Sequence, residues 1–184
     1  MKPDWPLETE RLVLRPYNDG DLGSLHAVYS DPEVVRWLYY GPSALEQSRE
    51  KLARKIAGSE LSEEHGLSAA VQLRDGTYVG DAVLFYFSVE HKTVEIGFSF
   101  DSRHQGKGYA SEAARALVDW AFSQGFHRVI GRLEARNTAS ARVLEKLGMR
   151  REAHLVENEW VKGEWQSELV YAILESEWRA SETR

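Results

Sequence analysis

The chain of 184 residues contains no cysteine. This absence excludes disulfide bonds, a thiolate nucleophile and any zinc site that uses cysteine ligands. The six histidines are scattered without close pairs, so the sequence predicts no metal site. No apolar run approaches the roughly 20 residues of a transmembrane helix, and the N-terminus lacks the apolar stretch of a signal peptide. We therefore expect a cytoplasmic protein that does not bind membranes.

Positive charge is also scarce. Lysine and arginine number 23 against 29 aspartates and glutamates, which gives a net charge of -6. This balance argues against broad nucleic-acid binding, which depends on many contacts to phosphates. It is compatible with a cationic amine substrate, although many proteins carry negative charge only for solubility. Because 42 % of the residues are hydrophobic, the chain can bury a core, and we expect a single domain over residues 1–184.

The most informative stretch is a strand, a glycine loop and a helix in the middle of the chain. Residues 93–101 are β-branched and aromatic and form a short run, which predicts a strand. After the loop, small and apolar residues recur with the spacing of one helix face, and Gly125 is well placed to end that helix. The face consists of Ala110, Ala113, Ala114, Leu117, Val118, Ala121 and Phe122.

The loop between that strand and helix is suited to a phosphate or pyrophosphate. Glycines leave backbone N–H groups accessible, and the helix N-terminus adds unpaired N–H groups and a positive dipole end. Arg103, His104 and Lys107 add positive charge. Two known motifs do not fit: a P-loop needs serine or threonine where Gly108 stands, and the dinucleotide fingerprint needs a third glycine where Ser111 stands. A glycine-rich turn without a ligand remains the alternative.

Arg103-x-x-Gly106-x-Gly108 with the following Tyr109-Ala110 resembles the coenzyme A pyrophosphate loop of the GNAT acetyltransferase superfamily. Three further segments resemble other parts of that superfamily in the right order, so the resemblance covers nearly the whole chain. Residues 9–16 resemble the first strand of the RimJ/RimL branch, whose members acetylate protein N-termini. The other two segments are residues 137–149 and 159–174.

The resemblance implies an α+β fold: the GNAT fold, with a mixed central sheet of about seven strands and flanking helices. Its order is an antiparallel meander followed by β-α-β-α-β-β. Hydrophobic patterns and turn residues agree with this order. They predict strands near residues 12–14, 67–73, 78–89, 93–101, 128–134, 149–158 and 165–174. Helices are expected after a capping Asp19 or Asp21, from Ser43 to about Ile56, after the glycine loop and from Asn137. A bulge is expected next to Asp81, and residues 175–184 form a charged tail.

The resemblance also implies acetyl-CoA as co-substrate, although a longer acyl group is not excluded. The backbone of Phe98 and Phe100 would bind its pantetheine arm in the manner of an added strand, while their side chains belong to the core. Asn137 would contact the same arm, or it would only cap its helix. The pyrophosphate and its surroundings would involve Arg103, His104, Gln105, Gly106, Lys107, Gly108, Tyr109 and Ala110.

An amine acceptor is mostly protonated at neutral pH, so a base must remove a proton before attack. By resemblance Glu159 is the first candidate and Glu95 the second; Glu159 could instead be a solvated charge in an acidic hairpin. Many relatives place a tyrosine acid seven residues after the asparagine, where this chain has Leu144. Ser140 could assist the departing thiolate in its place, or it could be an idle residue of the first helical turn.

The acceptor is left open between two classes of amine. Trp37, Tyr39 and Tyr40 lie on a connector between helices, where they would line an acceptor cleft or plug the end of the core. The expected reaction is direct acetyl transfer to a primary amine, either a protein N-terminus or a small molecule. The alternative is a non-catalytic acyl-CoA-binding or regulatory module, which Leu144 keeps open. A homodimer is also left open.

Overall fold

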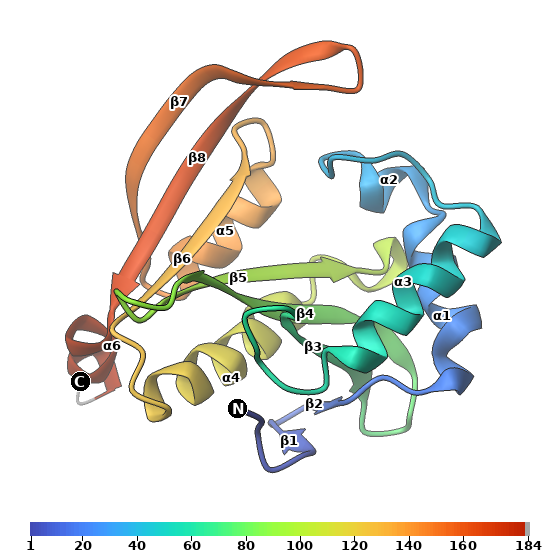
Figure 1. The fold of residues 1–184 in the computed structure, drawn as a ribbon, viewed down its shortest axis with the longest axis horizontal. Coiled ribbons are helices and arrows are strands. Elements are labelled where there is room, and N and C mark those ends of the chain that lie inside the picture. Colours follow the sequence, from blue (N-terminus) through green and yellow to red (C-terminus); the bar gives the residue numbers. More distant parts are fainter. Residues whose placement is uncertain (183–184) are drawn as a thin grey trace.

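The computed structural model describes residues 1–182 as a twisted eight-stranded mixed sheet with helices on both faces (Figure 1). The strand order is β1-β2-β3-β4-β5-β6-β8-β7. The strands are β1 (Leu7–Glu8), β2 (Leu12–Arg15), β3 (Leu67–Leu73), β4 (Tyr78–Ser88), β5 (Thr93–Phe100), β6 (Arg128–Glu134), β7 (Arg150–Val161) and β8 (Glu164–Leu174). The α-helices are α1 (Leu22–Tyr29), α2 (Pro32–Val35), α3 (Leu45–Ala57), α4 (Tyr109–Ser123), α5 (Thr138–Lys146) and α6 (Glu175–Glu182). Two short 3₁₀ turns are η1 (Asp19–Asp21) and η2 (Ser102–His104).

The predicted α+β architecture and its order of elements are confirmed, with corrections of detail. The sheet has eight strands instead of about seven because β1, a two-residue strand paired with β2, is too short to show a pattern. The segment after Asp31 forms helix α2 where only a turn was predicted, since the Asp31 side chain caps it and Pro32 is its first residue. The last two residues of the predicted tail lie outside the described part of the chain.

The bulge predicted beside Asp81 lies slightly earlier in β4. Val71 of β3 pairs with Gly80 and Gln72 with Tyr78, so Val79 is the extra residue. Gly80 then comes so close to β5 that an added Cβ would lie 2.4 Å from the carbonyl oxygen of Ser99. The bulge therefore requires glycine at position 80, and it sets the direction in which Asp81 points.

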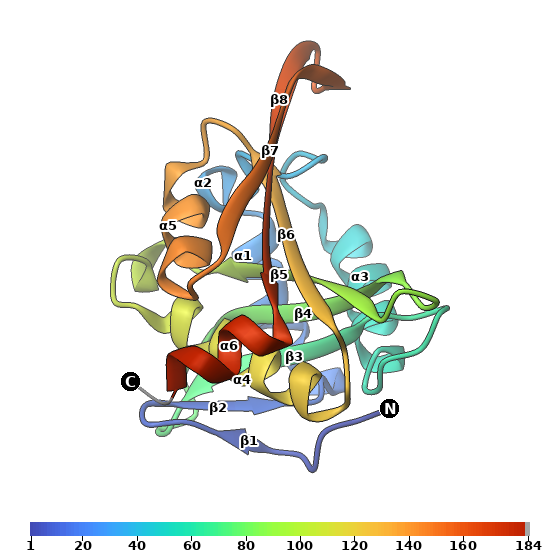
Figure 2. The same cartoon turned by 90° about the vertical axis from the view of Figure 1, so that its left-hand side faces the viewer.

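The helices cover the two faces of the sheet in separate layers (Figure 2). Helix α4 buries one apolar face, including Ala114, Leu117 and Val118, in the larger core cluster. On the opposite face, α1 and α3 pack through a smaller cluster that contains Leu25 and Leu52. Alternation along each strand supplies both layers, because successive side chains point to opposite faces of a sheet.

The central feature of the sheet is the separation of β5 from β6. These neighbours pair in parallel only between Thr93–Glu95 and Arg128–Ile130. Beyond that point β5 stays paired with β4 as far as Phe100, and β6 stays paired with β8 as far as Glu134. The two facing edges are therefore left open over the second half of each strand, where backbone polar groups are accessible to a ligand.

Strands β7 and β8 form a long arm that projects beyond the sheet (Figure 1). At its turn, the Lys162 ammonium donates hydrogen bonds to the carbonyl oxygens of Val35, at 2.9 Å, and Arg36, at 3.0 Å. These carbonyls end helix α2, so a cation there also complements the helix dipole. The arm is thus tied to the opposite half of the molecule. Within residues 1–182, no helix has both the length and the apolar character needed to cross a membrane.

Candidate active site

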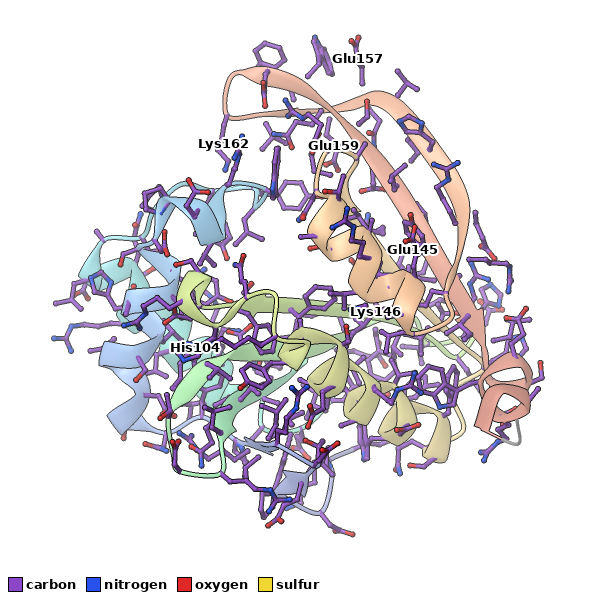
Figure 3. The ribbon with its side chains drawn as sticks, turned by 180° about the vertical axis from the view of Figure 1, so that it is seen from behind. His104, Glu145, Lys146, Glu157, Glu159 and Lys162 are labelled. Atoms are coloured by element: carbon purple, nitrogen blue, oxygen red, sulfur yellow. The ribbon has the colours of Figure 1, made fainter. Side chains whose placement is uncertain are left out.

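A cavity of about 920 Å³ occupies the opening between β5 and β6. Its walls come from β4, β5, β6, β7, β8, α3, α5, the connector after α2 and the glycine loop before α4. In Figure 3, Glu159 lies on the β7–β8 arm above this opening, while Glu145 and Lys146 lie on α5. The cavity is bounded by apolar residues of the core and by several charged side chains, so it can hold both an extended apolar arm and a polar reacting group.

The predicted glycine loop lies at one end of this central cavity. Gly106 and Gly108 have φ angles of +75° and +84°, the left-handed region that favours glycine. Gly108 is the N-cap of α4 and has no side chain to pair with the first helical N–H groups, which are left available. A Cβ placed on Gly106 would meet nothing within 4 Å. The loop therefore presents free amides beside open space, as an anion site requires.

A group of side-chain contacts that the sequence did not reveal holds this loop in place. The Arg11 guanidinium donates to the carbonyl oxygen of Lys107 at 3.0 Å and forms a 2.6 Å ion pair with Glu112. The Thr9 hydroxyl donates to the same Glu112 carboxylate at 2.6 Å. Arg11 also lies over the Tyr109 ring, 4.8 Å from its centroid. These contacts join residues about 100 positions apart, so only the fold could reveal them.

The three cations predicted to flank the loop have different surroundings. Arg103 is 75 % exposed and pairs at 2.6 Å with Asp101, whose pKa the Arg103 hydrogen bond lowers. Lys107 is exposed, and neither it nor Arg103 is part of the cavity wall. His104 does line the cavity, and its buried Nδ1 finds no hydrogen-bond partner among the described residues. Of the three residues, His104 is thus the one that the structure brings to the opening, with its Nδ1 3.9 Å from the Asp101 carboxylate.

The backbone positions predicted for an added strand lie on the cavity wall. Phe98 and Phe100 line it from β5, and Phe100 is buried in the core cluster while Phe98 packs against it. The Gln105 side chain donates to the carbonyl oxygen of Phe100 at 3.0 Å, which occupies one acceptor position of that group. Both phenylalanines thus have the core side chains that we expected and lie next to the open edge of β5.

Helix α5 brings three predicted positions to the cavity. The Asn137 side chain accepts a 3.1 Å hydrogen bond from the Ser140 N–H, so it caps the helix as expected. The Ser140 side chain is half-buried, lines the cavity and makes no hydrogen bond to any described residue. Leu144 is 2 % exposed and packs on β6 at Gly131, where an added Cβ would come within 2.7 Å of it. A free hydroxyl and an apolar contact therefore stand side by side.

A carboxylate cluster lies across the cavity from the glycine loop. Arg132 of β6 pairs with Glu95 of β5 at 3.1 Å and lies 3.7 Å from Glu168 of β8. Burial raises the pKa of both carboxyls and outweighs the opposing effect of Arg132. One guanidinium thus faces two carboxylates. Glu95 was a candidate from the sequence, whereas Arg132 and Glu168 were not. Glu168 is 6 % exposed and stands directly before the apolar run of residues 169–174 in β8, which was the available signal.

Glu159 belongs to the same wall. It is half-buried, lies opposite Gln166 in the β7–β8 pairing and faces the cavity with Glu168. Tyr39 from the connector lies beside Glu159, and burial together with the neighbouring Glu159 carboxylate raises the pKa of Tyr39 to about 12. The structure therefore brings the first and second base candidates, Glu159 and Glu95, to one cavity, with a tyrosine from the opposite half beside the first.

The aromatic connector lines the cavity instead of plugging the core. Trp37 lies between two guanidinium groups, with the Arg36 carbon 4.7 Å and the Arg136 carbon 5.3 Å from its ring centroid. Tyr40 is 40 % exposed and its ring centroid lies 3.8 Å from the Lys51 ammonium nitrogen. These rings and Tyr39 are part of the cavity wall. The connector packs on the core through Val34, Val35 and Leu38.

A metal centre receives no support from the arrangement of side chains. Throughout residues 1–182, no three histidine, aspartate or glutamate side chains are grouped so that they could hold a metal ion. The chemistry that this cavity offers is instead that of carboxylates, a hydroxyl and backbone amides.

Comparison with known proteins agrees with this geometry. Residues 11–150 match the family model described as the acetyltransferase (GNAT) domain. The chain is 33 % identical over 173 residues to the uncharacterized N-acetyltransferase YnaD of Bacillus subtilis, covering 94 % of this chain and 98 % of that protein. The crystal structure of a GNAT-family acetyltransferase from Bacillus anthracis matches with a TM-score of 0.85 at 33 % identity, covering 94 % of this chain and 99 % of the other.

A more distant solved structure has the same fold. Spermidine N-acetyltransferase from Vibrio cholerae, crystallised in complex with CoA and spermine, matches with a TM-score of 0.79 over 93 % of this chain and 99 % of its own. The two sequences are 21 % identical, so the likeness demonstrates a shared fold alone.

Proposed function

This chain belongs to the GNAT acetyltransferase family, and from that premise we propose that it moves an acetyl group from acetyl-CoA directly to a primary amine. The observation that carries the proposal is the cavity between β5 and β6. It has free backbone amides at one end and a set of carboxylates at the other. The chain has no cysteine to carry the acetyl group, which favours direct attack in a ternary complex.

The donor side of the cavity fits coenzyme A. The amides that follow Gly106 and those of the first turn of α4 would hold the pyrophosphate, since they have open space before them. The unpaired edge of β5 around Phe98 would bond to the amide-rich pantetheine arm. Asn137 caps its own helix with its side chain, so it would act on the arm through the helix that it holds in place. Acetyl-CoA supplies a thioester whose carbonyl carbon is open to attack.

On the acceptor side, Glu159 accepts a proton from the ammonium group of the acceptor. The freed amine nitrogen forms a bond to the thioester carbonyl carbon, and the bond from that carbon to sulfur breaks. After attack the nitrogen loses its second proton, and this proton is taken up by the departing coenzyme A thiolate, so the products are the neutral acetylated amine and the free thiol. General base catalysis of this kind is worth roughly 10²- to 10⁴-fold in rate. Glu95 is held by Arg132 at 3.1 Å, so it is less free to serve as the base.

The leaving thiolate needs a hydrogen-bond donor, and Ser140 offers one. Its hydroxyl lines the cavity close to the N-terminus of α5, where the helix dipole favours developing negative charge. Leu144 cannot donate a proton. The unpaired Ser140 hydroxyl and the carboxylate cluster in one cavity favour an enzyme over a non-catalytic module of the same fold, the alternative that Leu144 keeps open.

The acceptor class is a further part of the proposal. The segment formed by residues 9–16 and the closing hairpin resemble the RimJ/RimL branch, which favours a protein N-terminal amine. The connector residues Trp37, Tyr39 and Tyr40 would contact the acceptor from the far side of the cavity. Small-molecule amines are the competing class, because the family's fold accommodates both.

Release of free thiol from acetyl-CoA, measured with peptides, polyamines and amino sugars, tests the proposal. Glu159→Gln should lower kcat by about 10²-fold or more, remove the acidic limb of the pH–rate profile and leave acetyl-CoA affinity unchanged. The matched control is Glu157→Gln on the same hairpin, since Glu157 is exposed and lies outside the cavity wall (Figure 3). Binding of coenzyme A without turnover of any acceptor would favour the non-catalytic module, and loss of activity in Glu95→Gln alone would reverse the assignment of the base.

A further inference from the structure

The half of the cavity nearest α3 carries positive charge that the proposed acetyl transfer does not use. Lys51, Arg54 and Lys55 are spaced i, i+3 and i+4 on α3, so they share one helix face, and all three line the cavity. Figure 1 shows α3 and the β7–β8 arm, which bears Glu159, on opposite sides of the opening. The cavity therefore has a basic end and an acidic end.

One of these three cations is fully paired. The Lys55 ammonium lies 2.9 Å from the carboxylate of Asp81 on β4, and both side chains are buried. The Asp81 carboxylate also accepts hydrogen bonds from the hydroxyls of Tyr17 and Tyr29, each at 2.9 Å. Asp81 is therefore occupied by three donors and has little capacity left for a second lysine.

Lys51 is held in a different way. Its ammonium nitrogen lies 4.4 Å from the ring centroid of Tyr29 and 3.8 Å from that of Tyr40, and no carboxylate of residues 1–182 forms an ion pair with it. Burial and the nearby charge of Lys55 lower the pKa of Lys51 to about 8, so it is still largely protonated at neutral pH. A half-buried cation between two aromatic rings, open to a cavity, is arranged to receive an anion.

The charges near Lys51 do not neutralise its ammonium group. Arg54 is exposed and has no ion pair with any described residue. Of the carboxylates that line this half of the cavity, Glu33 and Glu64 are exposed, and Glu64 lies 3.8 Å from His65. The pair of unneutralised cations, Lys51 and Arg54, thus points to an anionic group on whatever enters from this side.

The distance between the two ends restricts the size of that molecule. In the β4–β5 pairing, Asp81 lies opposite Ser99 and Phe85 lies opposite Glu95. Ser99 and Glu95 are four residues apart, which is about 13 Å along a strand. The basic end adjoins Asp81, and the acidic end adjoins Glu95. An extended peptide covers the same distance in about four residues, whereas a single amino acid cannot span it.

We infer that the acceptor is a peptide whose N-terminal amine lies at the carboxylate end of the cavity and whose carboxylate, about three residues further on, is bound by Lys51 and Arg54. The inference rests on the proposed acetyl transfer and specifies its substrate. It sets this chain apart from an enzyme for polyamines, whose additional ammonium groups would meet two like charges at the basic end.

Thiol release from acetyl-CoA with three amidated peptides provides the test. They share the sequence Ala-Gly-Gly-X-Gly, with X as glutamate, glutamine or lysine. We expect kcat/KM for the glutamate peptide to exceed that for the glutamine peptide by about tenfold, since a hydrogen-bonded charge is lost, with the lysine peptide lower still. Ala-Gly-Gly-Gly is also compared with a free and with an amidated C-terminus. This pair shows whether a C-terminal carboxylate serves as well as a glutamate side chain.

The variant Lys51→Met keeps the length of the side chain and removes its charge, so the preference for glutamate over glutamine should fall to near unity while the KM for acetyl-CoA stays the same. Lys51→Arg should retain the preference, and Lys92→Met, an exposed lysine on the β4–β5 turn, makes the same change in net charge outside the cavity. Equal use of the glutamate and glutamine peptides, better use of spermidine, or an unchanged preference in Lys51→Met would each overturn the inference while leaving acetyl transfer intact. Absence of thiol release with every acceptor would instead reject the proposed function, and the inference with it.

Discussion

Substitution of alanine for Gly106 separates a ligand-binding role of the glycine loop from a purely structural one. Gly106 has a φ of +75° and open space around an added Cβ. Gly76, in the turn between β3 and β4, has a φ of +89° and equally open space, but it is not part of the cavity wall. The two positions therefore present the same backbone problem, and only one of them faces the proposed pyrophosphate.

The expected magnitudes follow from this match. Alanine in the left-handed region costs about 1–2 kcal/mol, so Gly106→Ala and Gly76→Ala should each lower Tm by a few degrees, about 2–4 °C per kcal/mol for a chain of this size. In Gly106→Ala the methyl group would also displace a phosphate oxygen from a backbone N–H. Loss of one hydrogen bond to a charged group costs about 1.5–3 kcal/mol, which corresponds to roughly 10- to 150-fold in Kd.

Calorimetric titration with coenzyme A and thermal melts of both variants provide the measurement. We expect similar Tm values for the two variants and a weakened coenzyme A affinity in Gly106→Ala alone. If both variants bind coenzyme A as tightly as the parent chain, the loop is only a turn and the pyrophosphate lies elsewhere. If both bind it equally poorly, the loss reflects general destabilisation, and the reasoning from the cavity wall is refuted.

Two further predictions concern charges that support the site. Asp81→Asn should lower the free energy of unfolding by about 3–5 kcal/mol, because it leaves the Lys55 ammonium buried without a counter-charge; chemical denaturation measures this, and a change below about 1 kcal/mol would contradict it. Arg103→Ala should destabilise the protein at neutral pH but not in acid. The Arg103 hydrogen bond lowers the pKa of Asp101, so its stabilisation is present above the usual value of 3.8 and is lost as the pH falls through the lowered pKa. Melts at several pH values should show the two curves converging in acid, and a constant offset would be evidence against the pairing.

Much of the fold could be predicted because local patterns agree with the tertiary structure. The regular spacing of small and apolar residues after the glycine loop predicted helix α4, and the run from Arg128 to Glu134 predicted β6 with the observed limits. Gly125 marked the end of α4, and Gly163 marked the turn between β7 and β8. Where a prediction failed, the local signal was weak: β1 has two residues, and α2 depends on one capping aspartate.

The composition of the site could be predicted only in part. Loop glycines and a helix cap are encoded by neighbouring residues, so they are visible in the sequence. The contact between Arg132 and Glu168 depends on β6 and β8 being adjacent, although α5 and β7 separate them in the chain. The pairing of Arg11 with Glu112 likewise depends on the packing of α4 beside β2. The sequence alone does not show which distant residues pair in this way, because their pairing depends on the register of the sheet.

The aromatic connector after α2 lies at the open end of the cavity, and it also joins the two parts of the sheet. The sheet consists of two parts, β1 to β5 and β6 to β8, and three residue pairs between β5 and β6 are the direct strand pairing across them. The connector after α2 supplies bridges at the open end. Lys162 of the arm bonds to the carbonyls that end α2, Trp37 lies against Arg136 of the second part, and Tyr39 reaches Glu159. Lys162 and Tyr39 are exposed and Trp37 is half-buried, and such contacts are individually worth about 1 kcal/mol or less. The larger core cluster takes residues from both parts and joins them below the opening, and these weak contacts add support at the rim of the cavity.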